Sequence, residues 1–266
     1  MKRSCFLLSF LIAVVSYGQQ AERLPGNFLA DDMALIKGGS FIMGSPANET
    51  GRNSNEGPLR QVTVSSFFIG RFPVTQSEYE KVMGKNPSHH DGLNLPVEQV
   101  SWFDAIEYCN RRSAMEGFTQ AYAVSGNTVT WNRAANGYRL PTEAEWEFAC
   151  RAGTRTPFYR GDSVNDAGWH VGNSGKQAQA VGQKLPNDWG LYDMHGNVLE
   201  WCWDLLGEYT AEAQTDPQGA VSGTHRVYRG GSWAFQPHLT RSAYRFGNNP
   251  NMTSYFVGFR VARNGF

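Results

Sequence analysis

Residues 139–147 read Arg139-Leu140-Pro141-Thr142-Glu143-Ala144-Glu145-Trp146-Glu147, and they predict the start of a helix more clearly than any other stretch of the chain. A threonine stands at the N-cap position with a glutamate three residues later, which is the spacing of a capping box. Trp146, Ala149 and Cys150 then fall on one face, and Gly153 ends the pattern. We therefore expect a short helix between these signals.

Two more helix starts have a similar signature. Thr75 is followed three residues later by Glu78, and the helix it begins should stop at Gly84. Ser101 begins another helix, which should end by Gly117. Helices of these lengths are insufficient for a helical bundle.

Short strands are expected before and after these helices. Residues 33–37 and 40–43 flank Gly38-Gly39, which predicts a two-residue hairpin. Residues 61–69 and 226–229 have strand composition, and residues 257–261 alternate Val257, Phe259 and Val261 with other side chains. Between them, residues 153–187 are polar and punctuated by glycine, and a loop of that length needs a packing or functional reason. We expect one α+β domain of short antiparallel strands, few short helices and much ordered loop.

The charge balance excludes binding that rests on bulk electrostatics. The 266 residues include 24 Lys and Arg and 24 Asp and Glu, so no net field favours nucleic acid or an anionic membrane. Hydrophobic residues make up 41% of the chain, which is too apolar for disorder. No nucleic-acid partner is therefore expected.

The N-terminus predicts a secretory signal peptide over residues 1–18. Lys2 and Arg3 precede an apolar run from Phe6 to Val15, which is shorter than the roughly 20 residues that cross a bilayer. Residues 19–32 then form a leader, and no later segment approaches spanning length. We expect a protein without a transmembrane segment that is secreted, periplasmic or held at the cell surface.

Three cysteines follow the signal peptide. Cys109, Cys150 and Cys202 are an odd number with no CxxC spacing, which does not predict a disulfide framework. Cys109 and Cys150 fit small apolar positions on helix faces. The six histidines include the pair His89-His90, which follows a turn-like Asn-Pro-Ser and is expected in a solvated loop rather than at a metal.

The motifs of residues 33–266 closely resemble those of the formylglycine-generating enzyme, or sulfatase-modifying factor, family. They are Met-Ala-Leu-Ile-Lys-Gly-Gly-Ser-Phe-Ile-Met-Gly at 33–44, Leu-Pro-Val-Glu-Gln-Val-Ser-Trp at 95–102, Gly-Leu-Tyr-Asp-Met-His-Gly-Asn-Val-Leu-Glu-Trp at 190–201, Arg-Gly-Gly-Ser-Trp at 229–233 and Gly-Phe-Arg at 258–260, together with the stretch at 139–147. The resemblance implies that these residues form one domain of the sulfatase-modifying-factor type, with that family's variant of the C-type-lectin-like fold.

The resemblance does not extend to the copper chemistry of the family oxidase. That enzyme uses a pair of cysteines just after the Gly-Gly-Ser motif, because Cu(I) selects soft thiolates. In this chain no cysteine follows Cys202. We therefore expect no copper and no formylglycine-generating activity, and the alternative is a metal-dependent oxidase of this family with an active site that the motifs do not reveal.

Calcium is the metal that the resemblance still implies. The family holds it around the Gly-Asn-x-x-Glu-Trp motif, and the matching positions here are Asp193, Gly196, Val198 and Glu200. Two carboxylates and backbone carbonyls form an oxygen shell that suits Ca²⁺. The alternative is that the two acids cap or pair with arginines.

The C-terminal segment is the expected ligand-binding surface. Residues 233–256 are rich in aromatic side chains, and rings with polar edges supply contact area at low ordering cost. The segment is also similar to the variable region of retroelement-diversified proteins, which implies binding of a protein or glycan ligand. The candidate residues are Ala234, Phe235, Gln236, His238, Tyr244, Phe246, Asn248, Asn249, Met252, Ser254, Tyr255 and Phe256.

Overall fold

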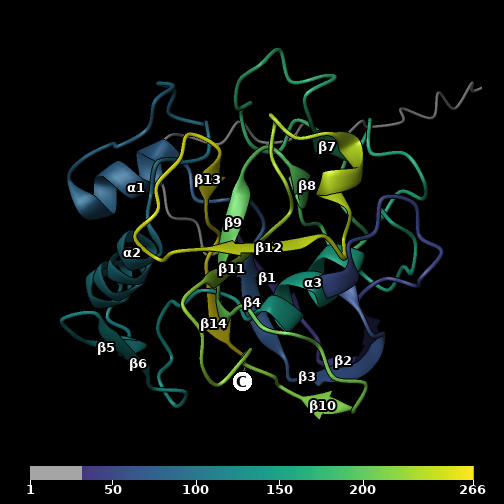
Figure 1. Cartoon of the computed structure of the whole chain (residues 1–266). Coiled ribbons are helices and arrows are strands. Elements are labelled where there is room, and N and C mark those ends of the chain that lie inside the picture. Colours follow the sequence, from purple (N-terminus) through teal and green to yellow (C-terminus); the bar gives the residue numbers. More distant parts are fainter. Residues whose placement is uncertain (1–31, 266) are drawn as a thin grey trace, which may run out of the picture.

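The computed structural model describes residues 32–265, so the predicted signal peptide and nearly all of the leader lie outside the described residues. Within this range, three α-helices lie among short strands: α1 (Gln76–Met83), α2 (Trp102–Met115) and α3 (Glu143–Arg151). Figure 1 shows α1 and α2 to the left of the central strands and α3 to their right, with long loops above. No helix within residues 32–265 has the length and apolar character that a bilayer crossing requires.

All three predicted helix starts are confirmed. Thr75, Ser101 and Thr142 are the N-caps, and each side chain accepts a hydrogen bond from the backbone N–H three residues later. In each case the acidic residue at that third position completes a capping box. Gly84 ends α1 in the left-handed region at φ 74°. Local chemistry therefore determines these helix boundaries.

The strands form small sheets. The central one has the order β12 (Arg245–Asn248), β11 (Arg226–Arg229), β9 (Leu199–Leu205), β13 (Val257–Gly258), in which only the β9–β13 pair is parallel. A second joins β1 (Met33–Ile36), β4 (Phe67–Gly70) and β14 (Ala262–Asn264), and a third joins β10 (Gln214–Thr215), β3 (Arg60–Val64) and β2 (Gly39–Met43). Two pairs complete the set: β5 (Tyr122–Ser125) with β6 (Thr128–Trp131), and β7 (Gly168–Trp169) with β8 (His195–Gly196). The expected α+β class is confirmed.

The predicted hairpin at Gly38-Gly39 is wrong. β1 pairs with β4 and β2 pairs with β3, so the two strands belong to different sheets. Gly38 is the crossing point, where a Cβ would lie 2.7 Å from the Val64 carbonyl oxygen. The glycine therefore permits a close backbone approach rather than a tight turn. The strand composition of residues 61–69 also does not form one strand. This stretch is divided into β3 and β4, which belong to different sheets.

The core lies on both faces of the central sheet. Trp201 and Tyr228 pack with α1 and α2 on one face, whereas Cys202 and Val227 pack with α3 on the other. The long loop over residues 153–187 also has a packing reason, because Tyr159 stacks on the buried His195 with ring centroids 4.5 Å apart. Cys109, Cys150 and Cys202 are buried free thiols, as expected of small apolar residues.

Helix α3 is buried on every side, although its sequence predicts only one apolar face. Trp146, Ala149 and Cys150 are fully buried as predicted, but so are its glutamates. Buried charges require partners. Glu145 pairs with the nearby Arg139 and Glu147 with Arg151 of the same helix. Glu143 and Glu147 also pair with arginines of the C-terminal part of the chain, and these pairs help to hold it.

Candidate functional site

Four buried arginines fix the C-terminal segment to the core: Arg241 and Arg245 lie within it, and Arg229 and Arg260 flank it. Arg229 pairs with Glu147 of α3, and Arg260 donates to both carboxylate oxygens of Glu200 at 2.6 Å. Arg245 donates to both oxygens of Glu143 at 2.7 Å. Arg241 makes the fourth attachment, to the loop before β3, and all four arginines are at most 2% exposed.

Arg241 binds acidic residues that lie about 190 positions earlier in the sequence. Its guanidinium donates to both oxygens of Glu56 at 2.6 and 2.8 Å and also pairs with Glu49. Burial alone would raise the pKa of Glu56, but the hydrogen bonds and the charge of Arg241 hold that pKa below its usual value. The charged side chains Arg241 and Arg245 of the C-terminal segment therefore face inward, and the side chains that it exposes are uncharged or histidine.

The predicted ligand-binding residues differ in exposure. Phe246 and Tyr255 are 48% and 47% exposed. Gln236, His238 and Asn249 are also exposed, and the half-buried members are Ala234, Phe235, Asn248, Met252, Ser254 and Phe256. Tyr244 is only 6% exposed, so its ring belongs to the interior and the expectation of a surface position is wrong. The neighbouring Arg241 and Arg245 draw this part of the segment inward.

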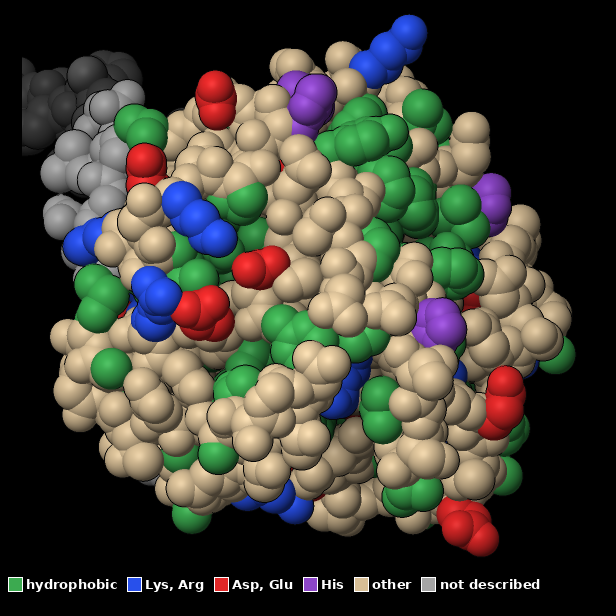
Figure 2. All heavy atoms as spheres, turned by 60° about the vertical axis from the view of Figure 1, so that its left-hand side comes forward, with side chains coloured by type: hydrophobic (Ala, Val, Ile, Leu, Met, Phe, Trp, Pro, Cys, Tyr) green, Lys and Arg blue, Asp and Glu red, His purple; other side chains and the backbone are tan. Residues whose placement is uncertain are grey.

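Three of the exposed or half-buried rings lie together. Tyr255 and Phe256 have ring centroids 5.2 Å apart, and Phe235 lies 5.6 Å from Phe256. Trp233 backs the group at 6.0 Å from Tyr255. We call these four residues the aromatic face. Figure 2 turns the left-hand side of Figure 1 forward and shows hydrophobic side chains gathered on this side of the molecule with histidine beside them.

Other predicted residues lie apart from the aromatic face. Phe246 packs on Tyr228 of the central sheet, with centroids 5.7 Å apart. His238 lies against Gly51, where a Cβ would come 2.7 Å from the histidine Cβ. The candidate set therefore divides into one ring cluster and separate surface positions.

The sequence reasoning missed two neighbours of the aromatic face. The His89 ring lies 6.0 Å from Tyr255, and the His90 ring lies 6.1 Å from Trp233. His89 is exposed, as its turn-like context predicts, but its loop borders the candidate site. These contacts join residues more than 140 positions apart, so no local pattern could have indicated them.

Glu98 holds this histidine loop in place. The backbone N–H groups of His89 and His90 donate to its Oε1 at 2.6 and 3.0 Å, and its own N–H donates to Ser88 Oγ at 3.2 Å. The next residue, Gln99, donates its N–H to the carbonyl of Ser254 at 2.9 Å. Glu98 therefore lies between the histidine loop and the loop that carries Tyr255.

The four predicted calcium ligands fit a cation only in part. Asp193 is 1% exposed, accepts 2.7 Å from the Gly182 N–H, and has no ion-pair partner within the described chain. Burial raises its pKa to about 6. Glu200, by contrast, already accepts from Arg260 with both oxygens and from Trp146 Nε1 at 2.7 Å.

A calcium ion at this position would therefore take Asp193 as its available carboxylate, with the carbonyls of Gly196 and Val198 as the other implied donors. Glu200 supports the alternative, in which an arginine is its partner. Within residues 32–265, no three His, Cys, Asp or Glu side chains are grouped as a metal site.

The side chains near the Gly-Gly-Ser motif do not fit copper. Ser232 is followed by Trp-Ala-Phe-Gln-Pro-His at 233–238, and none of these residues is a cysteine. The three described thiols are fully buried, and burial raises the pKa of each, that of Cys150 to about 12. They are therefore protonated thiols rather than thiolates.

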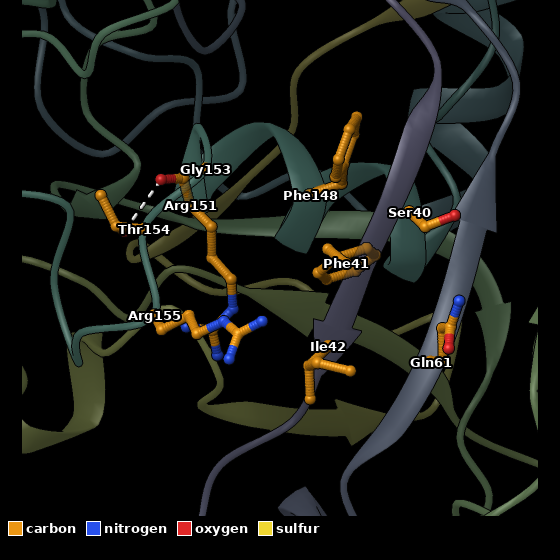
Figure 3. A pocket seen from close by; sticks show the side chains of 9 residues that line it. All are labelled: Ser40, Phe41, Ile42, Gln61, Phe148, Arg151, Gly153, Thr154 and Arg155. Atoms are coloured by element: carbon orange, nitrogen blue, oxygen red, sulfur yellow. Dashed lines mark hydrogen bonds between the residues drawn. The ribbon is translucent and has the colours of Figure 1, made fainter.

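A depression of about 350 Å³ lies away from the aromatic face. Figure 3 shows its lining, with Phe41 and Ile42 from β2, Phe148 from α3, and Arg155 from the loop after α3. Arg151 is already paired with Glu147, and no histidine, cysteine or carboxylate lines the depression. It therefore holds no acid–base or nucleophilic pair.

Comparison with known proteins agrees with this architecture. The family model of the sulfatase-modifying factor enzyme 1-like domain matches residues 19–265. The solved structure of Treponema denticola variable protein 1 is similar, with a TM-score of 0.80 and 31% identity, covering 88% of this chain and 95% of that one.

Among sequence relatives, the chaperone protein LppX of Paenibacillus barcinonensis is 34% identical over 97% of this chain and 98% of its own. The formylglycine-generating enzyme of Thermomonospora curvata is 30% identical over 88% of this chain and 94% of its own. The chain spans only 40% of the length of the serine/threonine-protein kinase pkn1 of Chlamydia pneumoniae, to which it is 34% identical.

These matches confirm the expected fold, the formylglycine-generating-enzyme variant of the C-type-lectin-like fold. The chain belongs to the sulfatase-modifying factor enzyme 1-like domain family.

Proposed function

We propose that this protein is an exported, non-catalytic module that binds a protein or glycan ligand through the aromatic face and the residues around it. The observation that carries the proposal is how side chains are distributed in the C-terminal segment, with charges inside and some of its aromatic rings at the surface. Its arginines are buried in ion pairs, while Tyr255 and Phe246 are about half exposed. Rigidly held rings bind with a small loss of side-chain entropy.

The structural likeness supports a binding role. The similar structure is that of a protein named as variable. In this chain the frame residues 229–233 and 258–260 enclose the candidate ligand residues, so substitutions between them would alter the surface while the buried arginines keep the fold. We extend the proposal to genetic diversification of this segment. A near-copy of its coding sequence beside a reverse-transcriptase gene would support that extension, and a locus without both would remove it.

We also propose that Ca²⁺ at Asp193, Gly196 and Val198 stiffens the scaffold. Asp193 supports this because a buried carboxylate without an ion pair is costly unless a cation compensates it. The ion would order the loop between β8 and β9 beneath the C-terminal segment and would take no part in chemistry.

The relative that favours another function is the formylglycine-generating enzyme of Thermomonospora curvata. A copper-loaded preparation given a sulfatase-motif peptide tests that function directly. We expect neither formylglycine product nor peptide-dependent oxygen consumption, because the thiol pair is missing. Turnover would overturn the non-catalytic proposal.

Capture by the intact protein tests the binding role. The Tyr255→Ser and Phe256→Ser double variant should lose at least tenfold in affinity for ligands selected on arrays of surface proteins and glycans. Val221→Ser is the matched control, because Val221 is a fully exposed apolar residue outside the C-terminal segment. Equal capture by the double variant and the control would contradict the proposed face.

A further inference from the structure

Glu98 is a buried carboxylate whose ion-pair contact within the described chain is with His90 Nδ1 at 4.0 Å, a ring that balances its charge only when the imidazole is protonated. It is 0% exposed, and none of the described lysines or arginines lies within ion-pair distance of it. Its Oε1 accepts two backbone N–H groups, whereas its Oε2 has no hydrogen-bond partner. Buried polar atoms are nearly always paired, so each exception calls for an explanation.

A second unpaired atom lies beside it. His90 Nδ1 is buried without a hydrogen-bond partner and stands 4.0 Å from Glu98 Oε1, too far for a hydrogen bond. The His90 side chain as a whole is 27% exposed. The carboxylate is therefore separated from solvent by an imidazole that takes no part in its hydrogen bonding.

Rings from two distant segments meet at the histidine loop that this carboxylate holds. His90 lies edge-on to Trp233, and His89 lies edge-on to His90 and next to Tyr255. Tyr255 and His89 are the exposed members of this group. An aromatic ring attracts a cation to its face, and a nearby negative charge in a region of low dielectric strengthens that attraction.

We propose that His89, His90, Trp233 and Tyr255, with the Glu98 that holds the histidine loop, form a subsite for an organic cation, the ammonium or guanidinium group of a lysine or arginine side chain on a protein ligand. This subsite deepens the proposed ligand binding and rests on it. The ring faces hold the cation, and Glu98 supplies the charge complementarity. A ligand segment would lie along Tyr255 and Phe256 with its basic side chain directed toward the histidine loop.

The probes are single amino-acid amides, used with the full protein. N-acetyl-lysinamide and N-acetyl-argininamide carry the cation, and N-acetyl-norleucinamide and N-acetyl-citrullinamide are their neutral counterparts. Binding is followed through the NMR shifts of the His89 and His90 backbone amides and the Trp233 indole. We expect saturable shifts with the cationic probes and at least tenfold weaker binding of the neutral ones.

Glu98→Gln tests the charge, because the amide oxygen can still accept the two backbone N–H groups. This substitution should weaken binding of the cationic probes about fivefold to tenfold and leave binding of the neutral probes unchanged. Glu212→Gln, an exposed acid beside β10, is the matched control and should change neither. Tyr255→Leu should weaken the cationic probes without disturbing the fold, because that ring is 47% exposed.

Equal binding of cationic and neutral probes, absence of shifts with either, or full cation affinity in Glu98→Gln would each overturn the subsite. Its failure is distinct from failure of the proposed function. If ligand capture is lost in the Tyr255 and Phe256 variants but is unchanged in Glu98→Gln, the aromatic face is supported as the binding surface and the cation subsite is rejected.

Discussion

The guanidinium of Arg245 donates to both carboxylate oxygens of Glu143, the first residue of α3, at 2.7 Å. This pair joins β12 to the helix with the clearest start signal in the sequence. Both side chains are 2% exposed. The ion pairs of Arg229, Arg241 and Arg260 repeat the arrangement along the C-terminal segment.

Removing one partner of this pair should be strongly destabilising. Arg245→Met leaves Glu143 with less charge compensation in the interior, and such losses typically cost about 3–5 kcal/mol of unfolding free energy. Urea denaturation measures the change. Arg111→Met is the control, because Arg111 pairs with Glu107 on the surface and exposed pairs contribute about 0–1 kcal/mol. Equal losses in both variants would contradict the anchoring role.

Asp204 should make stability depend on pH. Burial, followed by the charge of Glu143, raises its pKa to about 8, and its Oδ2 accepts the Glu143 N–H at 2.8 Å. The folded protein then binds this proton more tightly than the unfolded chain does. The stabilising contribution is complete below the unfolded pKa and is lost as pH rises toward about 8.

Asp204→Asn keeps an acceptor for that N–H but cannot ionise. Its melting temperature relative to the wild type should therefore increase between pH 5 and pH 9. Thermal melts across that range check the difference, in which the other titrating groups largely cancel. A constant offset at every pH would show that Asp204 is not the titrating group.

Substituting alanine for Tyr244 and for Tyr255 should affect stability to different extents. Tyr244 is 6% exposed and Tyr255 is 47% exposed. Tyr244→Ala should cost about 3–5 kcal/mol, as large aromatic truncations in a core do. Tyr255→Ala should cost less than about 1 kcal/mol and act on ligand capture instead. Chemical denaturation of both variants distinguishes these outcomes, and a large loss in Tyr255→Ala would place that ring in the core.

Calcium should raise the melting temperature if Asp193 holds it. At a concentration a hundredfold above the dissociation constant, a bound ion stabilises by about 2.7 kcal/mol. Melting in millimolar Ca²⁺ and in excess chelator measures the effect. Asp193→Asn should reduce the difference, whereas Glu212→Gln should retain it. Identical melting with ion and chelator would remove calcium and leave the Glu200–Arg260 pair as the organising contact of this loop.

The sequence by itself determined the local elements. The capping boxes at Thr75, Ser101 and Thr142 place the helix starts because each depends on hydrogen bonds within four residues. Strand β11 has the bounds that its composition predicts. The lack of a cysteine after Cys202 is also a property of the sequence alone, and our proposal of a protein without the copper chemistry rests on it.

Only the tertiary structure decided which side chains reach the surface of the proposed binding face. Gly38-Gly39 has the composition of a hairpin turn, but the approach of Val64 sends the two strands into different sheets. Tyr244 is drawn inward because buried acids elsewhere in the chain fix its neighbours Arg241 and Arg245, whereas Tyr255 is 47% exposed. His89 reaches Tyr255 for a similar reason, since Glu98 holds its loop. Such placements depend on packing and ion pairs between residues far apart in the chain, which no local pattern encodes.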